Sequence, residues 1–181
     1  MQKRTHALVA RTLIRSETGF SAKRFELAFL FGSFLPDINP FSYLKGSLHY
    51  HKLKGHNYAN SRAYINAKIL KLQCRQRWNI WQYYTLGKLT HYLADAYTYP
   101  HNEDYPNTML DHHCYETNLR RFMRGYLSHR YICRQQSRRD LIAALDELHE
   151  QYMATRASMY RDACYILKAT GLLMAGCLPT A

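Results

Sequence analysis

Apolar residues recur along most of the chain at the three- and four-residue intervals of an amphipathic helix. Residues 57–77 are an example, with Tyr58, Ile65, Ile69 and Leu72 on one face. The same pattern predicts helices over residues 1–14, 22–34, 57–77, 81–97, 110–126, 140–153 and 157–173. It therefore predicts an all-α fold, and the length suits one domain spanning residues 1–181.

The predicted helices end at residues that interrupt helical structure. The helix over 22–34 stops at Gly32-Ser33 and the turn before Asp37, and the helix over 81–97 stops before Pro100. Residues 37–55 form a connection rich in Gly, Pro, Tyr and His. A connection of that length in a compact domain is usually functional or mobile. The basic segment 130–139 is predicted to be a solvated link between helices.

Composition narrows the class of protein. Hydrophobic residues make up 47% of the chain, which argues against disorder, and no apolar run approaches the roughly 20 residues of a membrane span. No export signal is visible, and no C-x2-C pair occurs, so we expect reduced, buried thiols and a cytoplasmic protein. Peripheral attachment to a membrane remains open. The cysteines concerned are Cys74, Cys114, Cys133, Cys164 and Cys177.

The net charge of +12 predicts an anionic partner. Nucleic acid, an anionic membrane surface and a phosphorylated substrate all satisfy that requirement, and charge alone does not choose between them.

One short stretch concentrates side chains that bind metals. His91, Asp95, His101, His112 and Glu116 occur as H-x3-D-x5-H-x10-H-x3-E. These are nitrogen and oxygen donors of the kind that zinc selects. Two pairs have i,i+4 spacing, so each pair projects from one face of a helix. An aspartate on an apolar helix face needs a positive partner, and a metal ion provides one.

The motif HYLAD-x4-PH, which begins at His91, followed by H-x3-E, resembles the zinc-dependent phospholipase C family. That family is related to the single-strand-specific nucleases. The resemblance implies an all-α phospholipase C/nuclease-like domain whose helices hold two to three zinc ions. The first implied site uses Asp37, a loop histidine, His91 and Asp95; the second uses His101, His112 and Glu116; the third uses His6 with Asp95 as a bridge.

Two details of the implied ligand set stay open. The loop histidine is assigned to His56, which precedes a predicted helix, with His51 as the alternative and His49 as a weaker third. Secreted members of the family use the amino group of the mature N-terminus as a ligand. This chain instead begins at Met1 with His6 nearby, so the third site departs from the family pattern. His113 is expected to neighbour the site, and His129 and His149 are expected at the surface.

The implied activity is hydrolysis of a phosphodiester bond, in phospholipid or another phosphodiester, by a metal-activated water with Asp37 as general base. The alternatives are a nuclease of the same superfamily and a metal-binding structural or degenerate, non-enzymatic member. The DHHC sequence at residues 111–114 matches the signature of protein palmitoyltransferases, but this chain lacks their membrane spans and cysteine-rich zinc module. An adjacent His-Asp doublet, which the HD phosphohydrolases require, does not occur.

Overall fold

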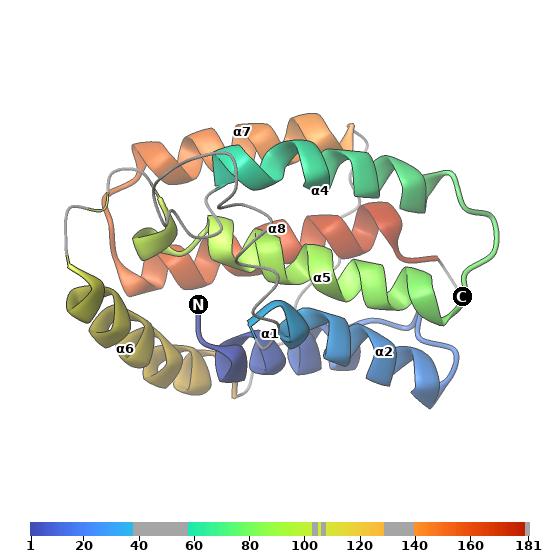
Figure 1. The fold of residues 1–181 in the computed structure, drawn as a ribbon, viewed down its shortest axis with the longest axis horizontal. Helices are drawn as coiled ribbons and strands as arrows, with labels where there is room; N and C mark the ends of the chain where they lie inside the picture. The colour runs from blue at the N-terminus through green and yellow to red at the C-terminus, as the bar shows by residue number, and fades with distance from the viewer. Residues whose placement is uncertain (38–57, 103–104, 106–107, 129–139, 180–181) are drawn as a thin grey trace.

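The computed structural model describes residues 1–37, 58–102, 105, 108–128 and 140–179, and the described part is helical (Figure 1). Its α-helices are α1 (Lys3–Ser16), α2 (Lys23–Phe34), α4 (Tyr58–Gln73), α5 (Ile80–Ala96), α6 (Met109–Leu127), α7 (Leu141–Ala154) and α8 (Met159–Cys177). Two short 3-10 turns, η1 (Leu35–Asp37) and η2 (Tyr99–His101), follow α2 and α5. The all-α prediction is confirmed, and each predicted helix is present with ends shifted by a few residues.

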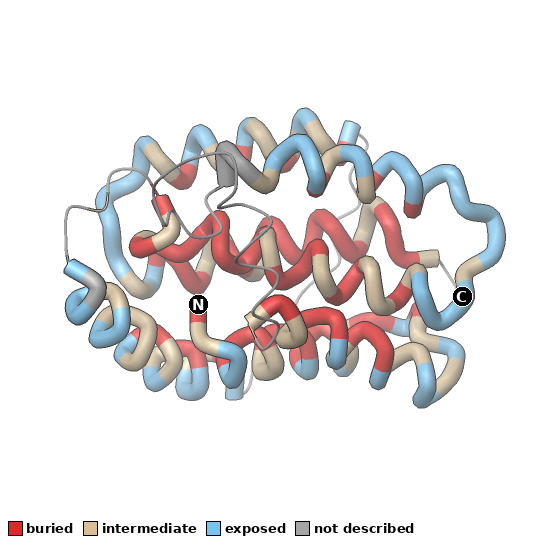
Figure 2. Tube along the Cα trace, viewed as in Figure 1, coloured by how far each residue is buried: buried red, intermediate tan, exposed pale blue. Residues whose placement is uncertain are grey.

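Helix α5 lies at the centre of the bundle. It packs against α1, α2, α4 and α8, and Figure 1 shows it between α4 and α2. Buried positions concentrate along α5 and α8, whereas α4 and α7 are exposed along their outer sides (Figure 2). The core side chains of α5, Leu86, Leu89 and Leu93, are fully buried. The donors on α5 are therefore carried by the most enclosed helix of the fold.

Polar side chains define where the site helices begin. Asn79 Oδ1 accepts a hydrogen bond from Trp81 N at 2.9 Å, and Gln82 Oε1 accepts one from Asn79 N at 3.0 Å, so a capping box starts α5. Thr108 and Asp111 form the same arrangement at the start of α6. These caps fix where the two helices that carry the i,i+4 donor pairs begin.

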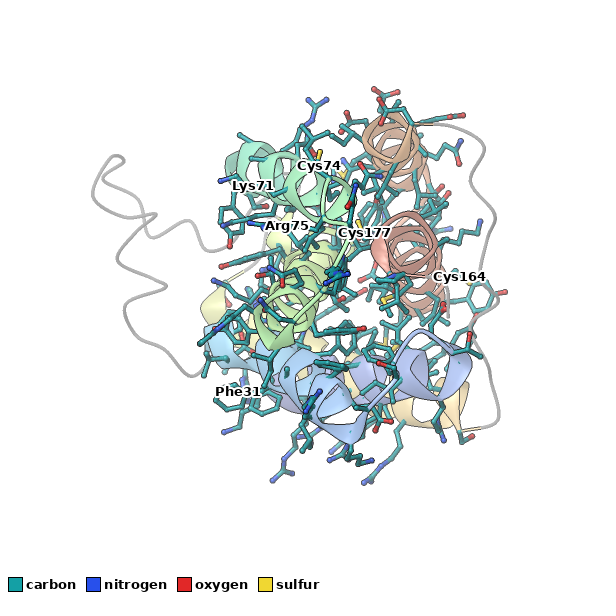
Figure 3. All side chains as sticks on the ribbon, turned by 90° about the vertical axis from the view of Figure 1, so that its right-hand side faces the viewer. Phe31, Lys71, Cys74, Arg75, Cys164 and Cys177 are labelled. Carbon is teal, nitrogen blue, oxygen red and sulfur yellow. The ribbon has the colours of Figure 1, made fainter. Side chains whose placement is uncertain are left out.

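The cysteine prediction is partly wrong. Cys74, Cys114, Cys164 and Cys177 are free thiols, as expected, and Cys133 lies outside the described residues. Only Cys177 among the four is buried, while Cys74 and Cys114 are exposed. Figure 3 shows Cys74 near Arg75 at the end of α4, away from Cys164 on α8. Exposure follows from helix register, because Cys114 lies on the side of α6 opposite buried Leu119.

Candidate metal centre

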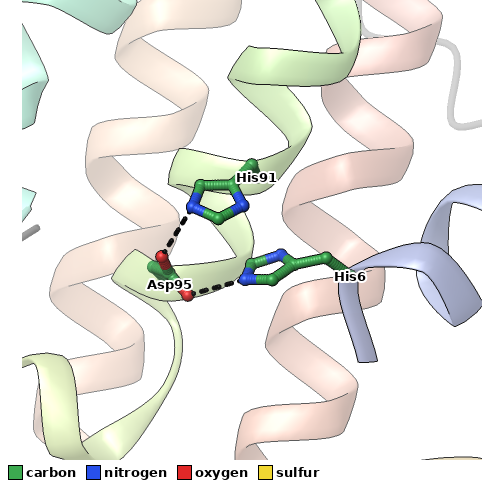
Figure 4. Close-up of side chains that lie close together, drawn as sticks. All are labelled: His6, His91 and Asp95. Atoms are coloured by element: carbon green, nitrogen blue, oxygen red, sulfur yellow. Dashed lines mark ion pairs between the residues drawn. The ribbon is translucent and has the colours of Figure 1, made fainter. Parts of the chain in front are cut away.

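Helices α1 and α5 bring three predicted donors together in the core. His6 comes from α1, and His91 and Asp95 lie one turn apart on α5 (Figure 4). Asp95 Oδ1 is 3.1 Å from His6 Nε2, and Asp95 Oδ2 is 3.2 Å from His91 Nε2. The two imidazole rings stack with centroids 3.8 Å apart. The carboxylate of Asp95 thus lies between two histidines, each facing a different oxygen.

The protonation states of this group suit metal binding. Burial lowers the pKa of His6 to about 3, with a further contribution from neighbouring His91, so His6 is neutral near pH 7. His91 Nδ1 lies 3.0 Å from the Ser33 carbonyl oxygen and must donate to it, because a carbonyl can only accept. This contact leaves the lone pair on His91 Nε2, on the side that faces Asp95. A neutral imidazole held in one tautomer is the form that binds a metal ion.

Asp37 extends this group from η1. Its Oδ1 lies 3.6 Å from His91 Nε2, and its Oδ2 lies 3.8 Å from His6 Nε2. Oδ2 is buried and finds no hydrogen-bond partner among the described residues. Burial, aided by the negative charge of Asp95, raises the pKa of Asp37 to about 6. A partly buried carboxylate directed at two histidine nitrogens, but too far from them for hydrogen bonds, is what a cation between them would explain.

A second group forms where η2 meets α6. His101 lies on η2, and His112 and Glu116 lie one turn apart on α6. Glu116 Oε1 is 3.1 Å from His101 Nε2 and 3.0 Å from His112 Nε2. Burial alone would raise the pKa of Glu116, but the hydrogen bonds with both histidines hold it well below its usual value. Glu116 is therefore ionised throughout the physiological range.

The amino group of Met1 connects the two groups. It lies 2.7 Å from Asp95 Oδ1, 2.9 Å from Glu116 Oε1 and 2.7 Å from His101 Nε2. The Met1 carbonyl oxygen lies 3.1 Å from His6 Nε2, which donates to it, so binding of a metal ion by Nε2 requires that proton to move to Nδ1. Burial works against a charged amine, but the two carboxylates outweigh it and raise the pKa of the Met1 amino group. This buried positive charge sits where the carboxylates of both groups converge.

The donor spacing fits zinc. Two ligands of a tetrahedral zinc ion, each about 2.1 Å from the metal, lie about 3.4 Å apart. The nitrogen–oxygen distances around His6 and His91 run from 3.1 to 3.8 Å and bracket that value. Within each of the two groups all three donor atoms lie within 4.8 Å of one another. Both groups therefore have the chemistry and the spacing to hold an ion.

A buried carboxylate that the sequence reasoning missed supports the second group. Asp162 on α8 is fully buried, and it was not among the predicted site residues. Its oxygens accept hydrogen bonds at 2.9 Å from Tyr99 N, Tyr115 Oη and Tyr152 Oη, and Arg161 pairs with it at 3.2 Å. Tyr99 opens η2 and Tyr115 precedes Glu116. Asp162 thus fixes the backbone that presents the donors of the second group.

The remaining predicted histidines are distributed as follows. His49, His51 and His56 lie outside the described residues, as do His129 and the segment 130–139. His113, which was expected to neighbour the site, is exposed on α6. His149 is not a surface residue: its ring packs 5.5 Å from that of Tyr97, and burial lowers its pKa to about 4. Position in a polar stretch misled the prediction, because α7 turns this residue toward the core.

A scan against protein-family models returned the model described as "Zinc dependent phospholipase C", matched over residues 5–159. The chain belongs to the zinc-dependent phospholipase C family. The family match contains all six donors of the two groups, and it begins after Met1, whose amino group lies between them. No curated protein and no solved structure matched the chain.

The family is zinc-dependent, so the two groups are candidate sites for zinc. The family also indicates hydrolytic activity toward a lipid substrate. Among the helices of the described residues, none is both long and apolar enough to cross a membrane.

Proposed function

We propose that this chain is a zinc-dependent phosphoric diester hydrolase that acts on phospholipid. The observation that carries the proposal is the proximity of two donor groups, His6/His91/Asp95 and His101/His112/Glu116, with Asp95 Oδ1 only 3.9 Å from His101 Nε2. Neighbouring zinc ions supply a water of lowered pKa and neutralise charge on the phosphoryl oxygens. We assign two to three ions to this centre.

The ligand roles follow from which atoms face one another. Asp37, His91 and Asp95 would hold one ion, together with His56 or His51 from the loop. His101, His112 and Glu116 would hold a second, and His6 with Asp95 a third. Asp95 would serve two of these sites, because its two oxygens face different histidines.

We assign Asp37 the additional role of general base. Its carboxylate lies at the exposed side of the first group, with its side chain 17% exposed, whereas Asp95 is 2% exposed. Of the two carboxylates, Asp37 is therefore the one with access to a water or substrate arriving from solvent.

Metal analysis tests the proposal first. Protein purified without chelator is expected to hold at least two zinc ions per chain by elemental analysis. Fewer than one zinc per chain would refute a multi-metal centre.

The bridging role of Asp95 has its own test. Asp95→Asn should remove zinc and lower the thermal stability together, because loss of the shared ligand leaves buried polar groups without a partner. Asp140→Asn is the matched control: Asp140 caps α7 through Ile142 N at 2.9 Å, and asparagine caps helices equally well. Unchanged zinc content in Asp95→Asn would contradict the bridge.

Substrate assays then separate the enzyme classes. We expect the zinc-loaded protein to hydrolyse phosphatidylcholine and a chromogenic phosphodiester, and chelation to abolish both reactions. The net charge of +12 also favours the related nuclease activity, so single-stranded DNA belongs in the same set of assays. Cleavage of DNA without release of phosphorylated headgroup would transfer the assignment to the nuclease. Full zinc content with no hydrolysis of any substrate would indicate a structural, non-enzymatic protein.

The free thiols of the described cysteines suit a reducing compartment, and we propose a cytoplasmic location with peripheral contact to membranes.

A further inference from the structure

Large apolar side chains are exposed together on α2 and α5. Leu27 is 56% exposed, Phe31 50% and Trp81 68%. Leu27 and Phe31 are one turn apart on α2, and Tyr84 joins them to Trp81, with ring centroids 6.5 Å from Phe31 and 6.2 Å from Trp81. Figure 3 shows Phe31 on the outer side of α2, away from α8. We call Leu27, Phe31 and Trp81 the apolar patch.

Cationic side chains border the apolar patch on α5 and α4. Lys88, one turn after Tyr84, places its Nζ 5.8 Å from the centre of the Tyr64 ring, and Lys68 reaches the same ring at 5.5 Å. The sequences of α2, α4 and α5 contain only two acidic residues, Glu26 and Asp95. Glu26 pairs with Lys23 at 2.8 Å, and Asp95 is buried in the metal centre. The outer face of these three helices is therefore aromatic and positively charged.

This face is continuous with the metal centre. Trp81, Tyr84, Lys88, Tyr92 and Asp95 follow one another at helical spacing along a single stripe of α5. Exposure falls from 68% at Trp81 to 1% at Asp95, so the stripe runs from solvent to the donors. The Tyr92 ring lies between the lysine-bordered ring of Tyr64 on α4 and the donor His91, with centroids 5.5 Å from each.

We propose that the outer face of α2, α4 and α5 docks on a phospholipid bilayer that contains anionic lipid. The apolar patch enters the headgroup region, where aromatic side chains are favoured, and Lys68 and Lys88 pair with lipid phosphates. A protein partner fits less well, because lysine is depleted from the centres of protein interfaces. Nucleic acid would not use exposed Leu27. This inference rests on the proposed phospholipid substrate and specifies how the protein reaches it.

Vesicle sedimentation tests the apolar patch. The zinc-loaded protein should bind vesicles of phosphatidylcholine with about 30% phosphatidylserine more tightly than pure phosphatidylcholine vesicles. The double variant Leu27→Ser/Phe31→Ser should bind at least about tenfold more weakly. Leu110→Ser and Tyr160→Ser are matched controls, 73% and 60% exposed on α6 and α8, and should bind as the wild type does. Equal loss in patch and control variants, or no loss in either, would overturn the proposal.

Two further measurements locate the contact. Lys68→Gln/Lys88→Gln should remove the preference for phosphatidylserine. The control Lys3→Gln/Lys168→Gln removes the same charge from other helices and should keep the preference. In a Trp78→Phe background the fluorescence of Trp81 should shift to the blue on adding vesicles. No shift would show that Trp81 stays in water and would contradict docking by this face.

Activity assays separate this inference from the proposed function. Leu27→Ser/Phe31→Ser should hydrolyse a short-chain, monomeric phosphodiester as the wild type does and lose about tenfold on vesicles. If no phosphodiester is hydrolysed while vesicle binding still depends on the patch, the proposed function fails and the docking face stands. The docking proposal is wrong if the double variant hydrolyses vesicles as fast as the wild type. It is also wrong if Lys68 and Lys88 bind single-stranded DNA in preference to vesicles.

Discussion

The close crossing of α2 and α5 makes Gly87→Ala the most informative substitution for the link between packing and the metal centre. A Cβ atom at Gly87 would lie 2.1 Å from the Phe29 carbonyl oxygen, and one at Gly32 would lie 2.2 Å from the Tyr84 carbonyl oxygen. The helices touch backbone to backbone here. Immediately beyond this crossing, Ser33 O holds His91 Nδ1 at 3.0 Å.

The size of the effect follows from that contact. The Cβ needs at least 3.0 Å from the oxygen, so α2 must move away by about 0.9 Å. Overpacking of this kind costs about 1–3 kcal/mol. Alanine recovers about 0.5–1 kcal/mol over glycine within a helix. Taking the middle of each range, we expect a net loss of about 1 kcal/mol in the free energy of unfolding, or about 2–4 °C in Tm for a chain of this size.

Thermal unfolding followed by circular dichroism, with zinc and with chelator, measures this loss. Zinc affinity should also fall, because the shift moves Ser33 and Asp37 relative to His91. Gly125→Ala is the matched control, since a Cβ at Gly125 on α6 has no neighbour within 4 Å among the atoms of the structure. It should stabilise the protein by about 0.5–1 kcal/mol. The reasoning is refuted if Gly87→Ala is as stable as the wild type or behaves like Gly125→Ala.

Three other predictions concern the surroundings of the site. Asp162→Leu should lower the free energy of unfolding by about 3–5 kcal/mol in urea, because it leaves Arg161 buried without its partner; a loss under 1 kcal/mol would show that the network is dispensable. His149 has a folded pKa of about 4 against 6.5 in the unfolded chain, so between these values unfolding takes up a proton, and stability falls as the pH falls. His149→Phe should therefore reduce proton uptake on unfolding near pH 5 by about one, and an unchanged pH dependence would contradict the burial of His149. His112→Gln should reduce zinc content, whereas His113→Gln, its exposed neighbour, should not; equal zinc in both would remove His112 from the ligand set.

Much of the site was predictable because its strongest signals are local. The pairs His91/Asp95 and His112/Glu116 are each one helical turn apart, so forming the helix is enough to place both members on one face. Apolar periodicity predicted the helices, and caps such as Asn79 and Thr108 set where they begin. The family resemblance carried by HYLAD-x4-PH then connected these pairs with zinc, and the match over residues 5–159 confirms the family.

Other features depend on contacts between distant parts of the chain. The Met1 amino group reaches Asp95 across 94 residues, and Asp162 reaches Tyr99 across 63. Periodicity shows which face of a helix is apolar, but not which neighbour covers it. That choice is made by side-chain volumes at the crossings, as where Gly32 and Gly87 let two backbones meet. The sequence by itself thus determined the helices and the donor pairs they carry. Tertiary packing decided that His6 joins His91, that Asp162 is enclosed and that His149 turns inward, because each depends on how closely separate helices approach.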